Sequence, residues 1–344
     1  NIGIRGATAE RSSNVTLMED GVLIAPAPYS NPAAYYFPTF KRMSSLEVLK
    51  GAPLLRYGPQ TTGGVINLIS TPIPNERQGY VETVTNERGS TDVHATYGDT
   101  NGDWGYLFET VQRSAQGFKD IDRSNRNSGF DISDYVGKLR WQGDRQSVTA
   151  KLQYSEETSN STYVGLTDAD FNQDPNRRYG LSSPDQMDNT HSGVSLTHQF
   201  EWSDNVSSTT TLYRNDFKRN WYKLSGAGNI IDQANAGDAN AQGILDGTVD
   251  TSGLNYKNNA REYVSQGVQT NFDVNIGNHE FDFGARAHED EMDRFQPVDV
   301  YDQVNGSLVF QNSVAPTGSN NRFETGEALS FWALDKWQAT DKLS

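Results

Sequence analysis

The chain has 344 residues, with 29 basic and 44 acidic side chains and a formal net charge of −15. This length suits one large domain or two ordinary ones, and the acidic balance argues against nucleic acid as a partner. Cysteine is absent, which excludes disulfides and thiolate chemistry. No segment approaches the roughly 18 apolar residues of a transmembrane helix. A transmembrane β-barrel needs only alternating segments of about ten residues, so a membrane location stays open.

The first part of the chain, residues 1–74, holds short strand candidates separated by Gly, Pro and Asn. Three prolines between residues 26 and 32 exclude both a helix and a central strand there. The segment from Leu46 to Pro74 contains two apolar runs joined by a turn-rich middle with paired Gly63 and Gly64. Paired glycines permit positive φ and close backbone approach. The pattern predicts a compact β unit.

Beyond this unit, the sequence predicts a series of long strands. Val148, Ala150, Leu152 and Tyr154 alternate with polar residues, and a period of two gives a strand one apolar and one polar face. The predicted strands cover residues 79–87, 90–98, 104–114, 130–142, 147–158, 189–203, 206–224, 260–276, 279–296 and 322–339.

The connections between these strands alternate between short and long, except for the first connection at residues 87–89. Outer-membrane barrels place short turns in the periplasm and long loops outside. Tryptophans at 104, 141, 202 and 337 lie beside short connections, as an interfacial aromatic belt requires. The short connections are 99–103, 143–146, 204–205, 277–278 and 340–342, and the long ones are 115–129, 159–188, 225–259 and 297–321. The pattern favours a barrel over a soluble sandwich.

Four segments in the first 74 residues occur in an order and spacing that resemble a known domain. They are NIGIRG (1–6), LMEDG (17–21), LEVLKG (46–51) and YGPQTTGGVINLI (57–69). Together they resemble the plug domain of TonB-dependent outer-membrane receptors. Segments 27–32 and 56–60 are similar to the plug apex and junction in the branch of that family that imports ferric citrate.

The resemblance implies an all-β fold, a transmembrane antiparallel barrel of about 22 strands, with an N-terminal α+β plug inside it. We therefore expect residues 1–74 to be an N-terminally truncated plug. Residues 75–344 are expected to be the first part of the barrel, truncated at the C-terminus, with about ten strands. The expected location is the outer membrane of a Gram-negative bacterium.

The resemblance also implies a function, which is import of a ferric chelate such as ferric citrate or a similar siderophore. TonB and its inner-membrane complex would supply the energy, and outer-membrane lipid and lipopolysaccharide would surround the barrel. No catalytic motif, metal site or cofactor is expected beyond the transported chelate. Two alternatives stay open: the same architecture importing cobalamin or a sugar, and a soluble all-β binding or adhesion protein.

The site prediction consists of two sets of residues, one that attaches the plug to the barrel and one that binds the ligand. The resemblance implies that Arg5 and Lys50 pair with barrel carboxylates and hold the plug. Arginines at the outer end suit an anionic chelate, because a guanidinium is permanently charged and matches carboxylate geometry. Their alternative partners are lipopolysaccharide phosphates or local Asp and Glu. The predicted ligand residues are Arg11, Tyr29 and Asn31 on the plug, and Arg177, Arg178, Arg214, Arg219 and Arg294 on the barrel.

Two acidic segments were weighed as cation sites. Residues 168–174 begin like a calcium loop, but Gln173 stands where the loop needs Gly and Tyr179 where it needs Glu. The acidic cluster at residues 288–293 is interpreted as a solvated or divalent-bridging face rather than a defined metal site.

Overall fold

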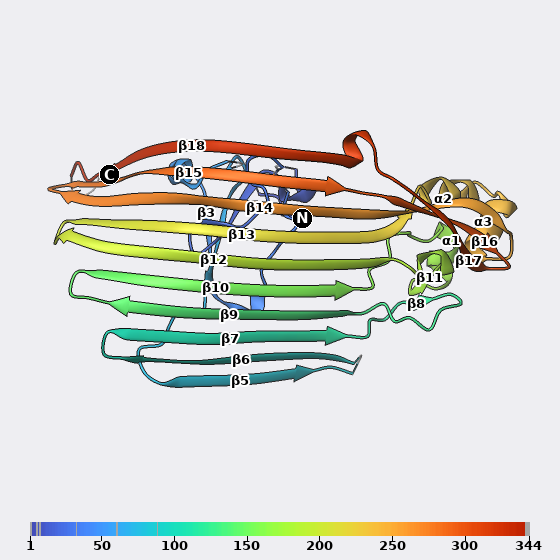
Figure 1. Ribbon diagram of the computed structural model, residues 1–344, viewed down its shortest axis with the longest axis horizontal. Coiled ribbons are helices and arrows are strands. Elements are labelled where there is room, and N and C mark those ends of the chain that lie inside the picture. Colours follow the sequence, from blue (N-terminus) through green and yellow to red (C-terminus); the bar gives the residue numbers. More distant parts are fainter. Residues whose placement is uncertain are drawn as a thin grey trace.

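The computed structural model describes residues 2–4, 6, 8–31, 33–59, 61–87 and 89–340. A four-stranded sheet near the N-terminus lies against a twelve-stranded sheet formed by most of the remaining chain (Figure 1). Within the described residues, no helix combines the length and the apolar character needed to cross a membrane.

The N-terminal sheet has the strand order β2-β1-β4-β3, with β1 parallel to β4 and the other pairs antiparallel. Its central strand β1 is buried along its whole length, and Leu17 and Leu68 lie in its core. Gly63 is required at its position, since a Cβ there would lie 2.8 Å from the carbonyl oxygen of Asn14. The elements are η1 (Glu10–Ser12), β1 (Val15–Glu19), β2 (Val22–Leu23), η2 (Phe40–Arg42), β3 (Met43–Leu49), η3 (Ala52–Tyr57) and β4 (Gly64–Ser70).

The large sheet, here called the wall sheet, confirms all ten predicted strands. Its strands are antiparallel, and the predicted span 130–142 is the observed β9. The longest strand, β14, begins at Thr251 rather than near residue 260, because its first residues pair with β16 instead of β15. The strands are β5 (Gln78–Thr85), β6 (Ser90–Asn101), β7 (Trp104–Ala115), β9 (Phe130–Gln142), β10 (Gln146–Ser159), β12 (Gln186–Ser203), β13 (Val206–Ser225), β14 (Thr251–Ile276), β15 (His279–Phe295), β16 (Val298–Val304), β17 (Ser307–Val314) and β18 (Asn321–Trp337).

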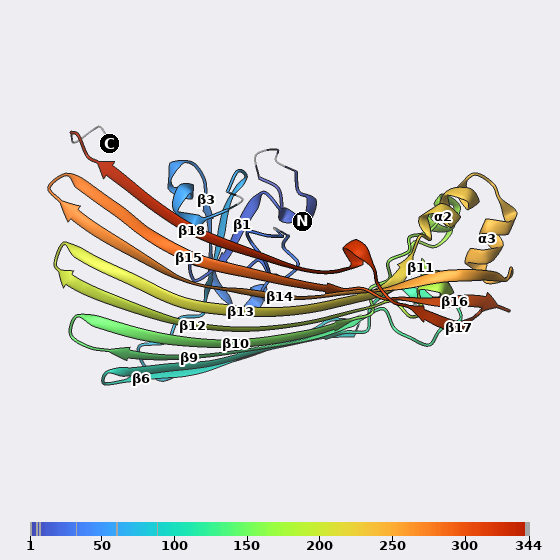
Figure 2. The same cartoon turned by 45° about the horizontal axis from the view of Figure 1, so that its top comes forward.

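The wall sheet is curved, and the N-terminal unit lies in its concave face (Figure 2). Alternate residues of each strand therefore point toward the N-terminal unit or away from it, on the convex face. Phe217, Tyr263 and Met292 face inward and pack with Tyr36 of the N-terminal unit. On the convex face, Phe108 stays 65% exposed although it is apolar. An apolar outer surface of this kind is what a lipid environment requires of a strand.

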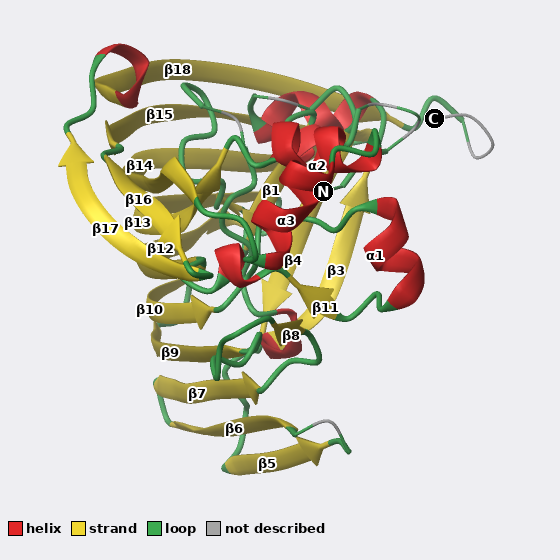
Figure 3. Ribbon diagram, turned by 90° about the vertical axis from the view of Figure 1, so that its right-hand side faces the viewer, coloured by secondary structure: helices red, strands yellow, loops and turns green. Residues whose placement is uncertain are grey.

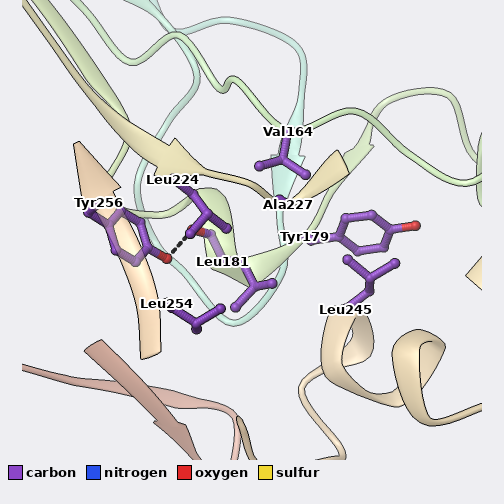
Figure 4. Packing of buried hydrophobic residues seen from close by; sticks show 8 residues of the cluster. All are labelled: Val164, Tyr179, Leu181, Leu224, Ala227, Leu245, Leu254 and Tyr256. Carbon is purple, nitrogen blue, oxygen red and sulfur yellow. Dashed lines mark hydrogen bonds between the residues drawn. The ribbon is translucent and has the colours of Figure 1, made fainter. Parts of the chain in front are cut away.

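The long connections gather at one end of the wall sheet and form a lobe (Figure 3). It has its own apolar core, in which the Tyr256 hydroxyl donates a hydrogen bond of 2.6 Å to the Leu181 carbonyl oxygen (Figure 4). The sequence did not predict this helical content. Besides β16 and β17, the lobe contains β8 (Asp120–Ile121), α1 (Asp168–Gln173), β11 (Arg177–Arg178), η4 (Gly180–Ser182), α2 (Gly228–Asn235), α3 (Ala239–Asp246) and η5 (Gly318–Asn320).

Candidate anion-binding site

Four arginines stand side by side on adjacent wall strands. Arg219 of β13 is the register partner of Arg261 on β14, which pairs with Arg294 on β15, which pairs with Arg322 on β18. Directly opposed residues of neighbouring strands point to the same face of a sheet. Because Phe217 faces inward, Arg219 two residues later does as well. We call these four residues the arginine row; it lies inside the concave face, toward the lobe.

The N-terminal unit reaches the arginine row through Tyr35. The Cζ atoms of Arg219 and Arg261 lie 4.4 and 5.3 Å from the centre of the Tyr35 ring, within the range of a cation–π interaction. Arg261 Nη1 also donates hydrogen bonds of 3.1 Å to the Tyr35 hydroxyl and 3.3 Å to the Tyr263 hydroxyl. Two like charges thus share one aromatic partner.

The arginine row lacks the counter-charges that buried arginines normally need. Arg219 is only 7% exposed, and the Nε atoms of Arg219, Arg261 and Arg294 have no hydrogen-bond partner. In the described part of the chain, only Arg322 of the four makes an ion pair, with Glu324 at 2.9 Å. A buried charge without a partner is costly. The row is therefore chemically suited to receive an anion.

In a second cluster, on the other side of the N-terminal unit, basic side chains pair with buried carboxylates. Arg42 binds Glu19 in a bidentate pair and donates from Nε to Asp134 of β9 at 2.9 Å. Lys151 of β10 contacts Glu19 and lies 2.7 Å from Asp20. Burial alone would raise the pKa of Glu19, but the charges of Lys151 and Arg42 outweigh it and lower that pKa to about 2. We call these five residues, together with Lys138, the charge cluster.

A third contact fixes the turn at residues 27–31 to the wall sheet. The backbone N–H groups of Tyr29 and Ser30 donate hydrogen bonds of 2.7 and 3.1 Å to Asp290 Oδ2. The other oxygen of Asp290 lies 2.6 Å from His288 Nε2, and His288 Nδ1 lies 2.7 Å from the Tyr213 hydroxyl. Both side chains of the His288–Asp290 pair are fully buried. Both oxygens of the Asp290 carboxylate that holds the turn therefore have hydrogen-bond partners.

The sequence and the fold are both similar to those of known proteins. Residues 1–65 match the family model described as TonB-dependent Receptor Plug Domain. These 65 residues therefore belong to the plug domain of TonB-dependent receptors, and the fold of the whole chain is similar to part of such a receptor. The N-terminal unit is its plug, the wall sheet corresponds to part of the receptor barrel, and the chain's place is the Gram-negative outer membrane. The family consists of transporters rather than enzymes.

Individual relatives agree with this assignment. The chain is 24% identical over 195 residues to the "Probable TonB-dependent siderophore receptor PirA" of Acinetobacter baumannii, covering 50% of this chain and 24% of that protein. The ferric citrate transporter FecA in its unliganded form shares the fold with a TM-score of 0.70 at 19% identity, over 97% of this chain and 46% of FecA. The siderophore receptor PiuA of Acinetobacter baumannii also gives 0.70, at 13% identity, over 98% of this chain and 49% of PiuA. The chain thus spans about a quarter of the curated relative and about half of each solved receptor.

The plug residues predicted to pair with the wall need correction. Arg5 lies outside the described residues. Lys50, which follows the end of strand β3, is exposed and forms no ion pair with any described residue. Arg42 makes the contact instead. The sequence signal for it was the pair of basic residues, Lys41 and Arg42, directly before β3.

The plug residues predicted to contact ligand lie near the arginine row but differ in role. Arg11 is exposed, and its carbonyl accepts a 2.9 Å hydrogen bond from the N–H of Ala34, next to Tyr35. Tyr29 packs its ring at 4.8 Å from His288, and Asn31 Nδ2 lies 2.9 Å from Met292 Sδ. Tyr29 and Asn31 therefore anchor the plug apex to the wall in this structure.

Three of the five predicted wall arginines are not part of the arginine row. Arg177 is held by Asp122, Asp170 and Asp246 at 2.7 to 2.9 Å, and its hydrogen bonds to Asp122 raise its pKa. Arg178 donates from Nη1 to the Pro175 carbonyl oxygen at 3.0 Å. These two residues organise the lobe.

Arg214 faces the convex side, because it alternates with the inward Tyr213, and it forms a bidentate pair with Asp216. It is therefore not in the concave site. Arg219 and Arg294 do belong to the arginine row. Arg261 and Arg322 were missed, since only the strand register shows that the four arginines are neighbours.

The two acidic segments have different structures. Residues 168–173 form α1, capped by the Thr167 hydroxyl, and Asp170 pairs with Arg177. In the segment 288–293, His288 and Asp290 point inward and are buried, which contradicts a purely solvated face. No group of potential metal ligands gathers among the residues that the structure describes.

Proposed function

We propose that the chain is part of a TonB-dependent receptor that imports an anionic ferric chelate, with ferric citrate or a similar carboxylate siderophore as the ligand. The arginine row is the binding site. The observation that carries the proposal is the set of three neighbouring guanidinium groups whose Nε atoms have no partner. Carboxylates satisfy such groups in a bidentate manner. The plug would end at residue 74, between the last plug strand at Ser70 and the first wall strand at Gln78.

In this proposal, Arg219 and Arg294 bind the chelate together with Arg261 and Arg322. Arg11 lies on the plug beside the same region and adds positive charge to the entrance. Tyr29 and Asn31 are assigned to positioning the apex, and Arg177, Arg178 and Arg214 are left out of the site.

TonB and its inner-membrane complex are the proposed energy source, acting on the plug, and lipid with lipopolysaccharide is the proposed environment of the convex face. The names of similar proteins support iron as the cargo: one is called a siderophore receptor and another a ferric citrate transporter. A neutral sugar or cobalamin is disfavoured, since neither would compensate the buried charge of Arg219.

The test is a binding comparison on the assembled receptor in detergent. Ferric citrate, a ferric catecholate, a ferric hydroxamate and cobalamin are titrated while intrinsic tryptophan fluorescence is followed. The proposal predicts saturable quenching by ferric citrate that weakens as salt rises, because exposed ends of the row are screened. Saturable binding of cobalamin alone, or no response to any ferric chelate, would reject it.

A further inference from the structure

A cavity lies between the plug and the wall on the short-turn side of the apex. Its volume is about 230 Å³. It is lined by Arg56 and Tyr57 of the plug and by Gln269, Asn271, Arg286, Trp332 and the exposed Asp273 of the wall. Since a water molecule takes a share of about 30 Å³ in the liquid, the space corresponds to roughly eight waters. It can therefore hold a small anion or one arm of a larger chelate.

Arg286 is the unusual residue of this cavity. It is 3% exposed, yet among the described residues it forms no ion pair. Its Nε donates to Gln269 Oε1 at 3.1 Å and its Nη1 to the Tyr57 carbonyl oxygen at 3.2 Å, both neutral acceptors. By contrast, the neighbouring Arg56 is neutralised by Asp282. A buried guanidinium whose only acceptors are neutral keeps its charge available to an anion.

The cavity has a defined position relative to the arginine row. Arg294 and Arg286 occupy inward positions of β15 eight residues apart, which corresponds to about 27 Å along a strand. Between them lies Asp290, which binds the backbone of Tyr29 and Ser30. The plug apex therefore separates the two basic positions and closes the direct path between them.

We propose that the Arg286 cavity is a second binding site for a carboxylate-bearing anion, occupied after the ligand has passed the plug apex. The inference rests on the proposed function for its ligand class. Arg286 would donate to the anion from the Nη2 edge, for which no described residue provides an acceptor. Trp332, whose indole fills the space left by Gly284, lies in the cavity wall and provides an optical signal for occupancy.

The first measurement uses free citrate as the probe, on the assembled receptor in detergent. The signal of Trp332 is defined as the fluorescence lost in Trp332→Phe. Citrate should change that signal saturably in the unaltered receptor and in Arg286→Lys, which keeps the charge. In Arg286→Gln the half-saturating concentration should rise at least about ten-fold, as expected on losing a charge-assisted hydrogen bond. An unchanged citrate response in Arg286→Gln overturns the proposal.

The second measurement separates this site from the arginine row. Arg286→Gln should bind ferric citrate at the cell surface within two-fold of normal, about the error expected for a distant site, while its uptake falls and Arg286→Lys restores it. The matched control is Arg113→Gln. Arg113 is a wall arginine on β7, several strands away from β15, and it is paired with Asp92 of β6. Normal uptake in Arg286→Gln overturns the second site, whereas loss of surface binding in every variant and in the unaltered receptor would instead reject the proposed ligand.

Discussion

The charge cluster and the arginine row use the same residue types in opposite ways. In the charge cluster, the guanidinium of Arg42 meets two carboxylates, one from the plug and one from the wall. In the arginine row, the guanidinium groups of Arg219 and Arg261 meet, among the described residues, only the aromatic ring of Tyr35 and the hydroxyl groups of Tyr35 and Tyr263. Paired buried charge holds two parts of a protein in register, while unpaired buried charge is costly until a ligand arrives. We therefore propose that the charge cluster attaches the plug and that the arginine row binds the ligand.

The largest effect is expected from breaking the charge cluster. Arg42→Met leaves Glu19 and Asp134 buried without their main partner, and removing one member of a buried pair costs about 3–5 kcal/mol. We expect a lower thermal unfolding temperature and faster proteolysis of the plug, with little change in chelate affinity. The control is Lys41→Met, whose partner Glu82 is exposed, because exposed pairs contribute about 0–1 kcal/mol. Equal stability of the two variants would contradict the role of Arg42.

Acidic pH should break the ion pairs of the charge cluster and so lower the stability of the protein. The pKa of Glu19 is lowered from 4.5 to about 2 in the folded protein. Its stabilisation, about 3 kcal/mol at 1.36 kcal/mol per unit, is therefore fully present above pH 4.5 and is lost as the pH falls toward 2. Unfolding should be followed between pH 6 and 2 in the unaltered receptor and in Glu19→Gln. The account is wrong if both proteins lose stability equally across that range.

Neutralising one residue of the arginine row should weaken ligand binding without unfolding the wall. For Arg219→Gln, the loss of one charge-assisted hydrogen bond corresponds to about 10- to 100-fold in the dissociation constant for ferric citrate. Arg214→Gln is the matched control, because Arg214 lies on the neighbouring part of β13 but faces the convex side. Titration calorimetry gives both constants, and similar losses in the two variants would remove the row from the site.

The smallest effect is expected at Lys50, the residue that sequence reasoning placed in the plug–wall contact. Lys50→Ala should change the unfolding temperature by no more than an ordinary surface substitution, within about 0.5 kcal/mol. Its side chain is exposed and unpaired with any described carboxylate. A destabilisation approaching that of Arg42→Met would show that Lys50 does attach the plug.

The fold was largely predictable because its signals are local. Alternation, short turns and tryptophan positions each reside within a few residues, so the strand β9 was predicted to the residue. The helices α1–α3 were not predicted, because their segments are short and are stabilised by the lobe core around Tyr179 and Leu245. Tertiary packing of this kind leaves little trace in a helix of six to eight residues.

The candidate site was predictable only in part. Charge chemistry pointed to arginine as the residue type, but the sequence could not distinguish Arg219, which faces inward, from Arg214, which faces outward. That distinction depends on where the alternation of β13 meets the plug. Arg261 joined the site only through the register of β13 with β14, and long-range register is set by many contacts rather than by one motif.

The central claim is that unpaired charge in the arginine row binds an anionic ferric chelate. The most direct test is the affinity of the assembled receptor carrying both Arg219→Gln and Arg261→Gln for ferric citrate, measured by titration calorimetry beside Arg214→Gln. The account predicts at least about a 100-fold weaker dissociation constant in the double variant, from two lost charge-assisted contacts, and an unchanged constant in the control. Equal affinity in the double variant and the unaltered receptor would contradict it.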